Sequence, residues 1–200
     1  MKLFKKLKNK YFVLRHGESN ANVLEIILSH LEHGTNEEFT LTKNGEKQVI
    51  NSVKKAKADG LLNGEIIIYS SPFSRCKRTA EIAKEILEVK DKIHFDERLR
   101  ERWFGNFERM HNSNYQKVWN IDTDNPNHKN FNVESVQEVQ ERTVSLIIDL
   151  EKKYQNRNIL LVSHGDVLQI MQTWFYKVSS SLHRSLKHLE TAEIRSLYLK

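Results

Sequence analysis

The chain has 200 residues, of which 38% are hydrophobic and 29% charged, and this size and composition favour one globular domain with a buried core. No apolar run approaches the roughly 18 residues of a membrane span, and a single cysteine, Cys76, excludes an internal disulfide. The net charge of +6 favours anionic ligands, from small phosphorylated molecules to larger polyanions.

The N-terminus is basic, because five of its first ten residues are lysine. We predict that residues 1–10 form a solvated tail and that residues 11–200 form a single domain. The apolar stretch at residues 11–14 is too short for the core of a signal peptide, so we expect a cytoplasmic protein. Basic and aromatic residues are not interleaved in any one segment, which argues against nucleic acid as a partner. We also expect no membrane partner, and the sequence leaves a homodimer open.

The first predicted strand spans residues 11–15, and a helix-like stretch follows it. A loop rich in Gly, Thr, Asn and Glu covers residues 31–40. Thr42 is a suitable N-cap for a helix that runs to about Asp59, and Gly60 is a suitable residue to end it.

An apolar run at residues 65–69 predicts a second, buried strand. Ser71 and Pro72 supply an N-cap and a first-turn proline, so we predict a helix from this dipeptide to about Leu87. A short strand at residues 92–95 follows this helix.

Two irregular segments come next. Residues 96–111 are charged and aromatic, and residues 112–132 have the composition of a surface insertion with one short helix. Ser135 and Glu138 form a capping box, and apolar residues then recur at helical spacing to Leu150. The capping box therefore predicts the start of a long helix.

The C-terminal part is predicted to contain a strand at residues 159–162, a helix at 166–176 and a last strand at 194–199. Strands that alternate with helices of this length are joined by crossovers, which build a mainly parallel sheet covered on both faces. The sequence therefore predicts an α/β fold of three layers, with helices on each side of one sheet.

Two of the predicted strands end in a histidine followed by a glycine, at His16-Gly17 and His164-Gly165. Open α/β sheets bind ligands at the carboxyl ends of their strands, so we expect the two histidines to meet in one pocket. A neutral His16 would expose a nucleophilic nitrogen, and the guanidinium of Arg15 is a bidentate hydrogen-bond donor suited to phosphate.

Arg75 lies in the first turn of the helix predicted after residues 65–69, which brings it to the same end of the sheet. A cation at a helix N-terminus opposes the helix macrodipole, so its position there needs another reason. A bound anion supplies that reason.

Five sequence blocks resemble the histidine phosphatase superfamily, which includes the cofactor-dependent phosphoglycerate mutases. All five occur in the family order between residue 11 and about residue 170. They are Arg15–Ser19 with Asn22, Leu41–Gly45, Ser70–Ala80, Leu99–Glu108 and Val162–Gly165. Their order and spacing together make the resemblance specific.

The resemblance implies a phosphoglycerate mutase-like α/β/α fold and a reaction through a transient phosphohistidine. It implies that His16 accepts the phosphoryl group and that Glu101 protonates the leaving oxygen. It also implies a set of residues that hold the phosphoryl oxygens: Arg15, Asn22, Arg75, His164 and Gly165.

Catalysis of phosphoryl transfer depends mainly on positioning and on electrostatic stabilisation of the charged oxygens. One close charge pair contributes on the order of 4 kcal/mol at an effective dielectric constant of about 20. Two arginines and a protonated His164 can therefore replace a magnesium ion. The sequence has no carboxylate cluster with metal-ligand spacing, so we expect neither a metal nor another cofactor.

The general acid has competitors in the sequence. Glu97 and Glu108 lie in the same irregular segment as Glu101, and Glu18 lies near His16. Alternatively, Glu101 is a surface partner of a neighbouring arginine. Register with the family favours Glu101, and the charge of a bound phosphate would raise its pKa toward neutral pH.

The chain departs from the family pattern at two places. Relatives often carry glycine where this chain has Arg109-Met110, and a small or neutral residue is common at the position of Asp166. The carboxylate of Asp166 either caps its helix and faces away from phosphate, or faces inward, in which case phosphate affinity would suffer.

The function favoured by these features is hydrolysis of the phosphate ester of a small metabolite. A cofactor-dependent phosphoglycerate mutase is the first alternative, but Glu101–Gly105 reads Glu-Arg-Trp-Phe-Gly where mutases typically have Glu-Arg-His-Tyr-Gly. A catalytically silent phosphate-binding protein is the second alternative. The substrate would be selected by the loops at residues 26–40 and 100–132.

Overall fold

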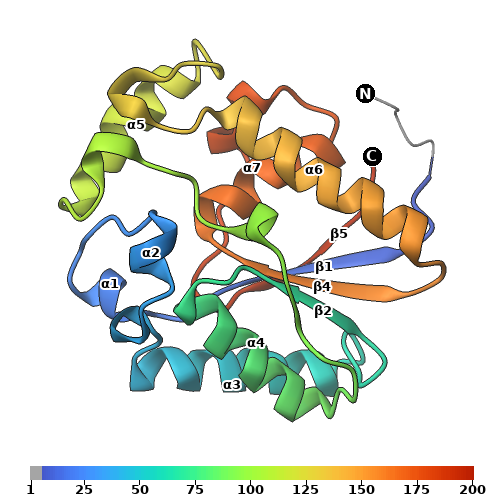
Figure 1. Cartoon of the computed structure of the whole chain (residues 1–200). Helices are drawn as coiled ribbons and strands as arrows, with labels where there is room; N and C mark the ends of the chain where they lie inside the picture. Colours follow the sequence, from blue (N-terminus) through green and yellow to red (C-terminus); the bar gives the residue numbers. More distant parts are fainter. Residues whose placement is uncertain (1–5) are drawn as a thin grey trace.

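The computed structural model describes residues 6–200, and a five-stranded sheet with the strand order β3-β2-β4-β1-β5 lies at its centre (Figure 1). Strands β1 to β4 pair in parallel, and β5 pairs antiparallel to β1. The strands are β1 (Lys10–Arg15), β2 (Ile67–Ser70), β3 (His94–Phe95), β4 (Asn158–Ser163) and β5 (Ile194–Leu197). The predicted α/β fold with a mainly parallel sheet is confirmed.

The long helices lie on both faces of this sheet (Figure 1). α3 and α4 pack together on one face, and α6 and α7 pack together on the other. They are α3 (Lys43–Ala58), α4 (Ser74–Leu87), α6 (Val136–Lys153) and α7 (Gly165–Phe175). The predicted three-layer arrangement is therefore confirmed.

Successive residues of β1 supply both halves of the core. Phe12 and Leu14 join the apolar cluster formed with α3 and α4, whereas Tyr11 and Val13 join the cluster formed with α6 and α7. All four side chains are buried. A strand covered on both faces needs no polar alternation, which explains why the strands appear in the sequence as continuous apolar runs.

Two predicted helix starts and one predicted helix end are confirmed. Thr42 Oγ1 accepts a hydrogen bond from the Gly45 amide at 2.9 Å, and Ser135 and Glu138 form the predicted capping box. Gly60 follows the C-cap of α3 with a φ of 71°, the left-handed conformation that glycine adopts without strain.

The predicted start of α4 is wrong. The helix begins at Ser74, with Phe73 as an N-cap that makes no side-chain hydrogen bond, so Pro72 precedes the helix rather than opening it. The Ser71 hydroxyl accepts a hydrogen bond from the Phe73 amide at 3.3 Å and also lies 2.9 Å from Nε2 of His164. Ser71 therefore keeps a local bond in the turn before the helix and adds a tertiary contact with this histidine.

The loop predicted at residues 31–40 contains α2 (Leu31–Gly34) and a 3-10 turn at Glu37–Phe39. Gly34 permits this folding, because a Cβ at its position would lie 2.2 Å from the ring of Phe73. The helix-like stretch after Gly17 is reduced to the four residues of α1 (Asn20–Val23).

The predicted short helix in the insertion is α5 (Tyr115–Asp122). The insertion is not only a surface feature, because Val118 and Asp122 are fully buried. Asp122 pairs with the guanidinium of Arg102 through two hydrogen bonds of 2.7 and 2.8 Å. This ion pair fixes α5 over the segment that carries Glu101.

The predicted N-terminal tail lies partly outside the described residues, which begin after residue 5. Within the described part, Lys10 already begins β1, and Asn9 is buried with its side-chain amide 2.8 Å from Glu151 Oε1. These last residues of the predicted tail are thus part of the fold. None of the helices in the described part of the chain combines the length and the apolar character that crossing a membrane requires.

Candidate active site

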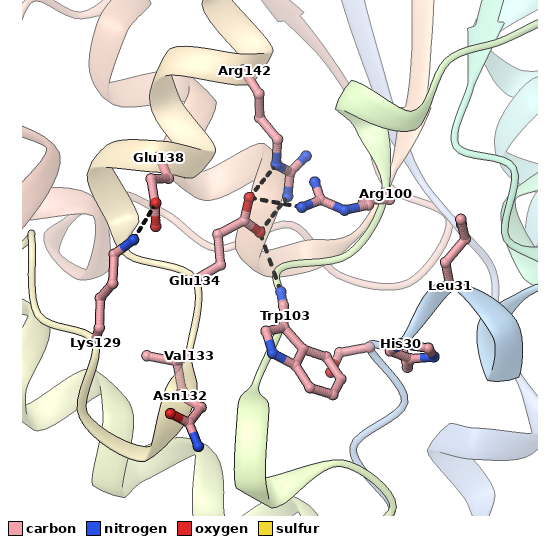
Figure 2. Close-up of a pocket in the computed structure, with 11 residues that line it drawn as sticks. His30, Leu31, Arg100, Trp103, Lys129, Asn132, Val133, Glu134, Glu138 and Arg142 are labelled. Atoms are coloured by element: carbon pink, nitrogen blue, oxygen red, sulfur yellow. Dashed lines mark hydrogen bonds and ion pairs between the residues drawn. The ribbon is translucent and has the colours of Figure 1, made fainter.

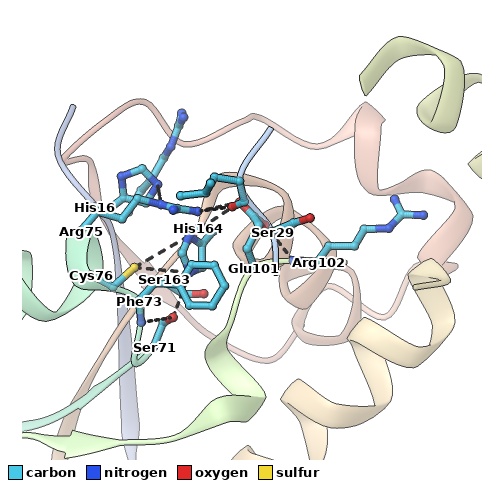
Figure 3. A network of polar contacts seen from close by, with 12 residues as sticks. His16, Ser29, Ser71, Phe73, Arg75, Cys76, Glu101, Arg102, Ser163 and His164 are labelled. Atoms are coloured by element: carbon cyan, nitrogen blue, oxygen red, sulfur yellow. Dashed lines mark hydrogen bonds and ion pairs between the residues drawn. The ribbon is translucent and has the colours of Figure 1, made fainter. Parts of the chain in front are cut away.

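His16 and His164 lie side by side at the carboxyl ends of neighbouring parallel strands. The register pairs Arg15 of β1 with Ser163 of β4, so the chain delivers the two histidines to the same level. Their ring centroids are 5.3 Å apart, with an angle of 65° between the rings. The predicted meeting of the two histidines is therefore observed (Figure 3).

The hydrogen bonds of His16 determine which of its ring nitrogens is free for chemistry. Nδ1 lies 2.7 Å from the carbonyl oxygen of Gly17, and a carbonyl can only accept, so Nδ1 carries the proton. Nε2 accepts from Nε of Arg75 at 3.2 Å. Burial, together with Arg75 and Arg15, lowers the pKa of His16 well below its ordinary value. The ring is thus neutral near pH 7, with a lone pair on Nε2.

Glycines on both histidine loops permit close approach of the backbone. A Cβ at Gly17 would lie 2.5 Å from the carbonyl oxygen of Gly45, so only glycine lets this loop touch the start of α3. A Cβ at Gly165 would lie 2.8 Å from His188 Cε1 and 3.2 Å from Arg15 Cζ. The second glycine therefore lets the Arg15 guanidinium lie against the N-terminus of α7.

Two arginines present unpartnered donors next to His16. Arg15 Nη1 donates to the Leu189 carbonyl at 2.7 Å, and Arg75 Nη2 donates to the Leu28 carbonyl at 3.0 Å. These bonds fix both guanidinium groups, yet Arg15 Nε and Arg75 Nη1 are buried without a hydrogen-bond partner among residues 6–200. Buried donors of this kind suit the oxygens of a phosphoryl group.

A cavity of about 120 Å³ lies in front of these groups. It is lined by six of the predicted site residues and by residues that the sequence analysis did not single out as part of the site. The six predicted residues are Arg15, His16, Asn22, Arg75, Glu101 and Gly165. His164 is fully buried beside His16. The structure therefore brings all seven predicted site residues to one place.

Glu101 has the protonation behaviour of a general acid. Burial raises its pKa to about 7 against the opposing effect of Arg75, and the charge of Asp166 adds to the increase. Its Oε1 accepts from the Arg102 amide at 2.9 Å, and its Oε2 lies 3.8 Å from Arg75 Nη2. The expected rise in pKa thus already exists without phosphate, because the protein itself removes water from the carboxyl group.

The competing carboxylates are engaged elsewhere. Glu18 accepts hydrogen bonds from Thr42 and Asn44, whereas Glu108 accepts hydrogen bonds from Ser29. Glu97 is exposed in a 3-10 turn. The remaining alternative, Glu101 as a surface residue, is wrong, because only 7% of Glu101 is exposed.

His164 differs from its expected charge. It contacts the Ser71 hydroxyl through Nε2 at 2.9 Å, and its Nδ1 lies 3.6 Å from Glu101 Oε2 (Figure 3). Burial and the neighbouring Arg75 lower its pKa well below the ordinary value, so the ring is neutral near pH 7. The prediction of a protonated His164 is therefore wrong for the site without bound phosphate. The sequence did not show how completely the ring is buried.

Asn22 lines the cavity, but its carboxamide oxygen serves the backbone. Oδ1 accepts hydrogen bonds from the amide of Ser19 at 3.0 Å and from its hydroxyl at 2.9 Å, which closes the capping box of α1. The two N–H donors of the carboxamide are not used by this cap. Asn22 can therefore offer only its nitrogen to a ligand.

Both departures from the family pattern have a structural consequence. Arg109 adopts a φ of 61°, a left-handed conformation that favours glycine. Asp166 lines the cavity rather than facing away, and its charge is offset by Arg102, whose Nη1 donates to Oδ2 at 3.4 Å.

Several lining residues were missed by sequence reasoning. His188 Nε2 lies 2.9 Å from Arg15 Nη1, and Tyr115 and Trp119 reach the cavity from α5. No motif marks these three positions in the sequence. The helical spacing of the two aromatic residues is the one signal that could have paired them.

A larger groove of about 840 Å³ is lined by residues that include Arg100 and Trp103, close to Glu101 in the sequence (Figure 2). Its carboxylates are already paired, because Glu134 contacts both Arg100 and Arg142, and Glu138 contacts Lys129. Neither His16 nor His164 lines it. The cavity that His16 lines is therefore the candidate active site, although its volume is smaller than that of the groove.

Within residues 6–200, no group of three or more His, Cys, Asp or Glu side chains is arranged to hold a metal ion. Metal independence stays a prediction, which an assay has to test.

Comparisons with known proteins place the chain in a family context. The family model of the histidine phosphatase superfamily (branch 1) matches residues 11–200. The uncharacterized phosphatase PhoE of Bacillus subtilis (strain 168) is 26% identical over 161 residues, which cover 80% of this chain and 74% of PhoE. The probable phosphoglycerate mutase GpmB of Cronobacter sakazakii is 29% identical over 184 residues, which cover 88% of this chain and 79% of GpmB.

Solved structures agree with this fold. A mycobacterial glucosyl-3-phosphoglycerate phosphatase superposes with a TM-score of 0.76 at 18% identity, covering 94% of this chain and 88% of that one. A phosphoserine phosphatase from Entamoeba histolytica gives a TM-score of 0.73 at 23% identity, covering 94% of this chain and 89% of that one. At these low sequence identities, the similarity of the two structures to this chain shows a shared fold only.

Proposed function

This chain belongs to the histidine phosphatase superfamily, and on that premise we propose that it hydrolyses phosphate esters of small metabolites through a phosphohistidine at His16. The observation that carries the proposal is the unprotonated Nε2 of His16, at a cavity lined by two arginines with unpartnered donors. A nucleophile, an anion site and a carboxylic acid with a pKa of about 7 then share one cavity.

In the first step, His16 Nε2 attacks phosphorus and the ester P–O bond breaks. The donors of Arg15 and Arg75 neutralise the charge on the equatorial oxygens, and this electrostatic stabilisation is the main source of catalysis in phosphoryl transfer. Before substrate binds, Arg75 Nε donates a hydrogen bond to the lone pair of His16 Nε2. When the N–P bond forms, this N–H can donate to a phosphoryl oxygen instead.

Glu101 supplies the proton that the leaving alcohol oxygen needs. A carboxylic acid with a pKa of about 7 is half protonated at neutral pH, which is the condition in which a group can act both as an acid and as a base. In the second step, water attacks the phosphohistidine and gives a proton to Glu101. The N–P bond breaks, and inorganic phosphate and neutral His16 are released.

Further features of the protein belong to this proposal. We infer one catalytic domain over residues 11–200, a cytoplasmic location, and a small phosphorylated substrate with neither nucleic acid nor a membrane as a partner. The free, buried Cys76 supports a reducing compartment.

The experiment that tests the function compares two activities of the purified chain. Release of phosphate from p-nitrophenyl phosphate and from a panel of phosphorylated metabolites is expected. Interconversion of 2- and 3-phosphoglycerate measures the mutase alternative, which the Cronobacter sakazakii relative keeps relevant. The proposal fails if the chain releases no phosphate from any ester, or if isomerisation is faster than phosphate release.

A further inference from the structure

The cavity that holds His16 contains more unpartnered polar atoms than a phosphoryl group uses. Six buried side-chain atoms of the described residues lack a hydrogen-bond partner, and four of them belong to residues that line this cavity. They are Arg15 Nε, Arg75 Nη1, Trp119 Nε1 and Asp166 Oδ1. The two arginine atoms suit phosphoryl oxygens, whereas the other two are one neutral donor and one acceptor.

Trp119 and Asp166 line the same cavity and share Arg184 as a neighbour. The guanidinium of Arg184 lies 3.8 Å from the ring centroid of Trp119, and its Nη1 lies 3.8 Å from Asp166 Oδ1. Tyr115 stacks on Trp119 with a centroid distance of 5.1 Å and an angle of 7° between the rings. The indole is therefore held in place by Tyr115 and Arg184, so its N–H keeps one direction.

Asp166 lacks a hydrogen-bond donor rather than a positive charge. Arg102 Nη1 donates to its Oδ2 at 3.4 Å, and Arg184 lies close to its Oδ1. Two arginines thus balance its negative charge. An acceptor left without a donor inside a protein costs free energy, and a ligand that supplies the donor recovers it.

We propose that Trp119 and Asp166 form a hydroxyl-binding subsite, and that the substrate is the phosphate ester of an alcohol that carries further free hydroxyl groups. A hydroxyl group both donates and accepts, so hydroxyls can donate to Asp166 Oδ1 and accept from Trp119 Nε1. An ammonium group cannot accept from Trp119. A carboxylate has no proton to donate to Asp166 Oδ1. The inference rests on the proposed phosphatase function and assigns its substrate class.

The test compares esters that differ only in these groups. Glycerol 3-phosphate and propyl phosphate share a three-carbon chain, but only the first carries hydroxyls. Because one unsatisfied buried polar group costs about 1 to 3 kcal/mol, we expect kcat/KM to be roughly ten- to hundredfold higher for glycerol 3-phosphate. Phosphoethanolamine against ethyl phosphate forms the ammonium comparison, for which we expect no comparable preference.

Trp119→Phe removes the N–H and keeps an aromatic ring in the stack. We expect the ratio of kcat/KM for glycerol 3-phosphate to kcat/KM for propyl phosphate to fall roughly tenfold in this variant. Trp103→Phe is the matched control, because Trp103 lines the larger groove and not this cavity. Thermal unfolding of both variants shows that they are folded.

The outcomes separate this inference from the function on which it rests. Equal kcat/KM values for glycerol 3-phosphate and propyl phosphate overturn the subsite while the phosphatase stands, as does an unchanged preference in folded Trp119→Phe. A stronger preference for phosphoethanolamine over ethyl phosphate assigns the subsite to an ammonium group and likewise overturns the proposal. Absence of phosphate release from every ester, p-nitrophenyl phosphate included, overturns the phosphatase and this subsite together.

Discussion

Arg75 donates a hydrogen bond from its guanidinium Nε to the Nε2 atom of His16 over 3.2 Å. Because Nδ1 of the same ring is tied to the Gly17 carbonyl, this bond requires the neutral tautomer with its lone pair on Nε2. Together with burial, Arg75 therefore lowers the pKa of His16, and its hydrogen bond fixes the ring.

The first prediction concerns the covalent intermediate. His16→Ala should abolish turnover, because no other lone pair of the described residues is held in the same position. Wild-type enzyme quenched rapidly without acid after exposure to labelled substrate should retain label that acid releases. His111→Ala, at an exposed histidine that pairs with Glu25, should behave as wild type in both assays. Wild-type rates in His16→Ala would falsify the mechanism.

The second prediction concerns Glu101. Glu101→Gln keeps the size of the side chain but cannot release a proton, so it should slow alkyl phosphates by roughly 10² to 10⁴-fold. It should slow p-nitrophenyl phosphate much less, because that leaving group needs little protonation. In the wild type, the rate with alkyl phosphates should fall as pH rises above about 7, where the acid ionises.

The control for this experiment is Glu97→Gln, at an exposed position in a 3-10 turn. It should leave both substrates unaffected. If Glu101→Gln slows the two classes of substrate equally, Glu101 positions substrate and is not the acid.

The third prediction concerns the influence of Asp166 on this acid. The charge of Asp166 raises the pKa of Glu101, so Asp166→Asn should lower that pKa. A lower pKa means that the acid ionises earlier, so the alkaline fall in kcat/KM should move to lower pH. Propyl phosphate is the substrate for this measurement, because it has no hydroxyl that could contact residue 166. An unmoved or upward-moved pH profile contradicts the electrostatic coupling.

The fourth prediction concerns the buried ion pair that fixes α5. Arg102 and Asp122 are both fully buried, so Asp122→Leu should destabilise the fold by roughly 3–5 kcal/mol, because Arg102 keeps only the longer contact with Asp166 as an ion pair. Combining it with Arg102→Met should restore much of the loss. Asp59→Ala breaks the exposed pair with Lys55 and should cost less than about 1 kcal/mol. Urea unfolding measures all of these variants.

The same pair makes a pH-dependent contribution to stability. Burial alone would raise the pKa of Asp122, but its hydrogen bonds and charge interaction with Arg102 outweigh burial and lower that pKa. Stabilisation from a carboxyl with a depressed pKa is fully present above the unfolded-state value of about 4 and is lost as the pH falls through the folded-state value. The stability difference between the wild type and the double variant should therefore shrink in acid.

The fifth prediction is that catalysis persists after chelation. Arg15 and Arg75 already present unpartnered donors to the cavity and can neutralise a phosphoryl group without a divalent ion. Dialysis against EDTA should leave kcat unchanged. Loss of activity that magnesium or zinc restores would show that the arginines do not suffice.

Local sequence signals were sufficient to predict the buried strands, several helix ends and the position of the pocket. Continuous apolar runs gave the buried strands, because a parallel sheet covered on both faces needs no polar alternation. Thr42, Gly60 and the Ser135 capping box marked helix ends through bonds that form within a few residues. The two His-Gly units indicated one pocket, since parallel strands bring their carboxyl ends to the same edge of a sheet.

Tertiary packing decided the features for which no local signal exists. α4 begins three residues after Ser71, whose hydroxyl contacts His164, and His164 loses its expected charge because the fold buries it completely. Asp166 faces the cavity because Arg102, more than 60 residues away in the chain, balances its charge. Burial and long-range pairing depend on which surfaces meet in the folded chain. The sequence therefore names the candidate catalytic residues, whereas their protonation states and the unpartnered polar atoms around them are properties of the assembled cavity.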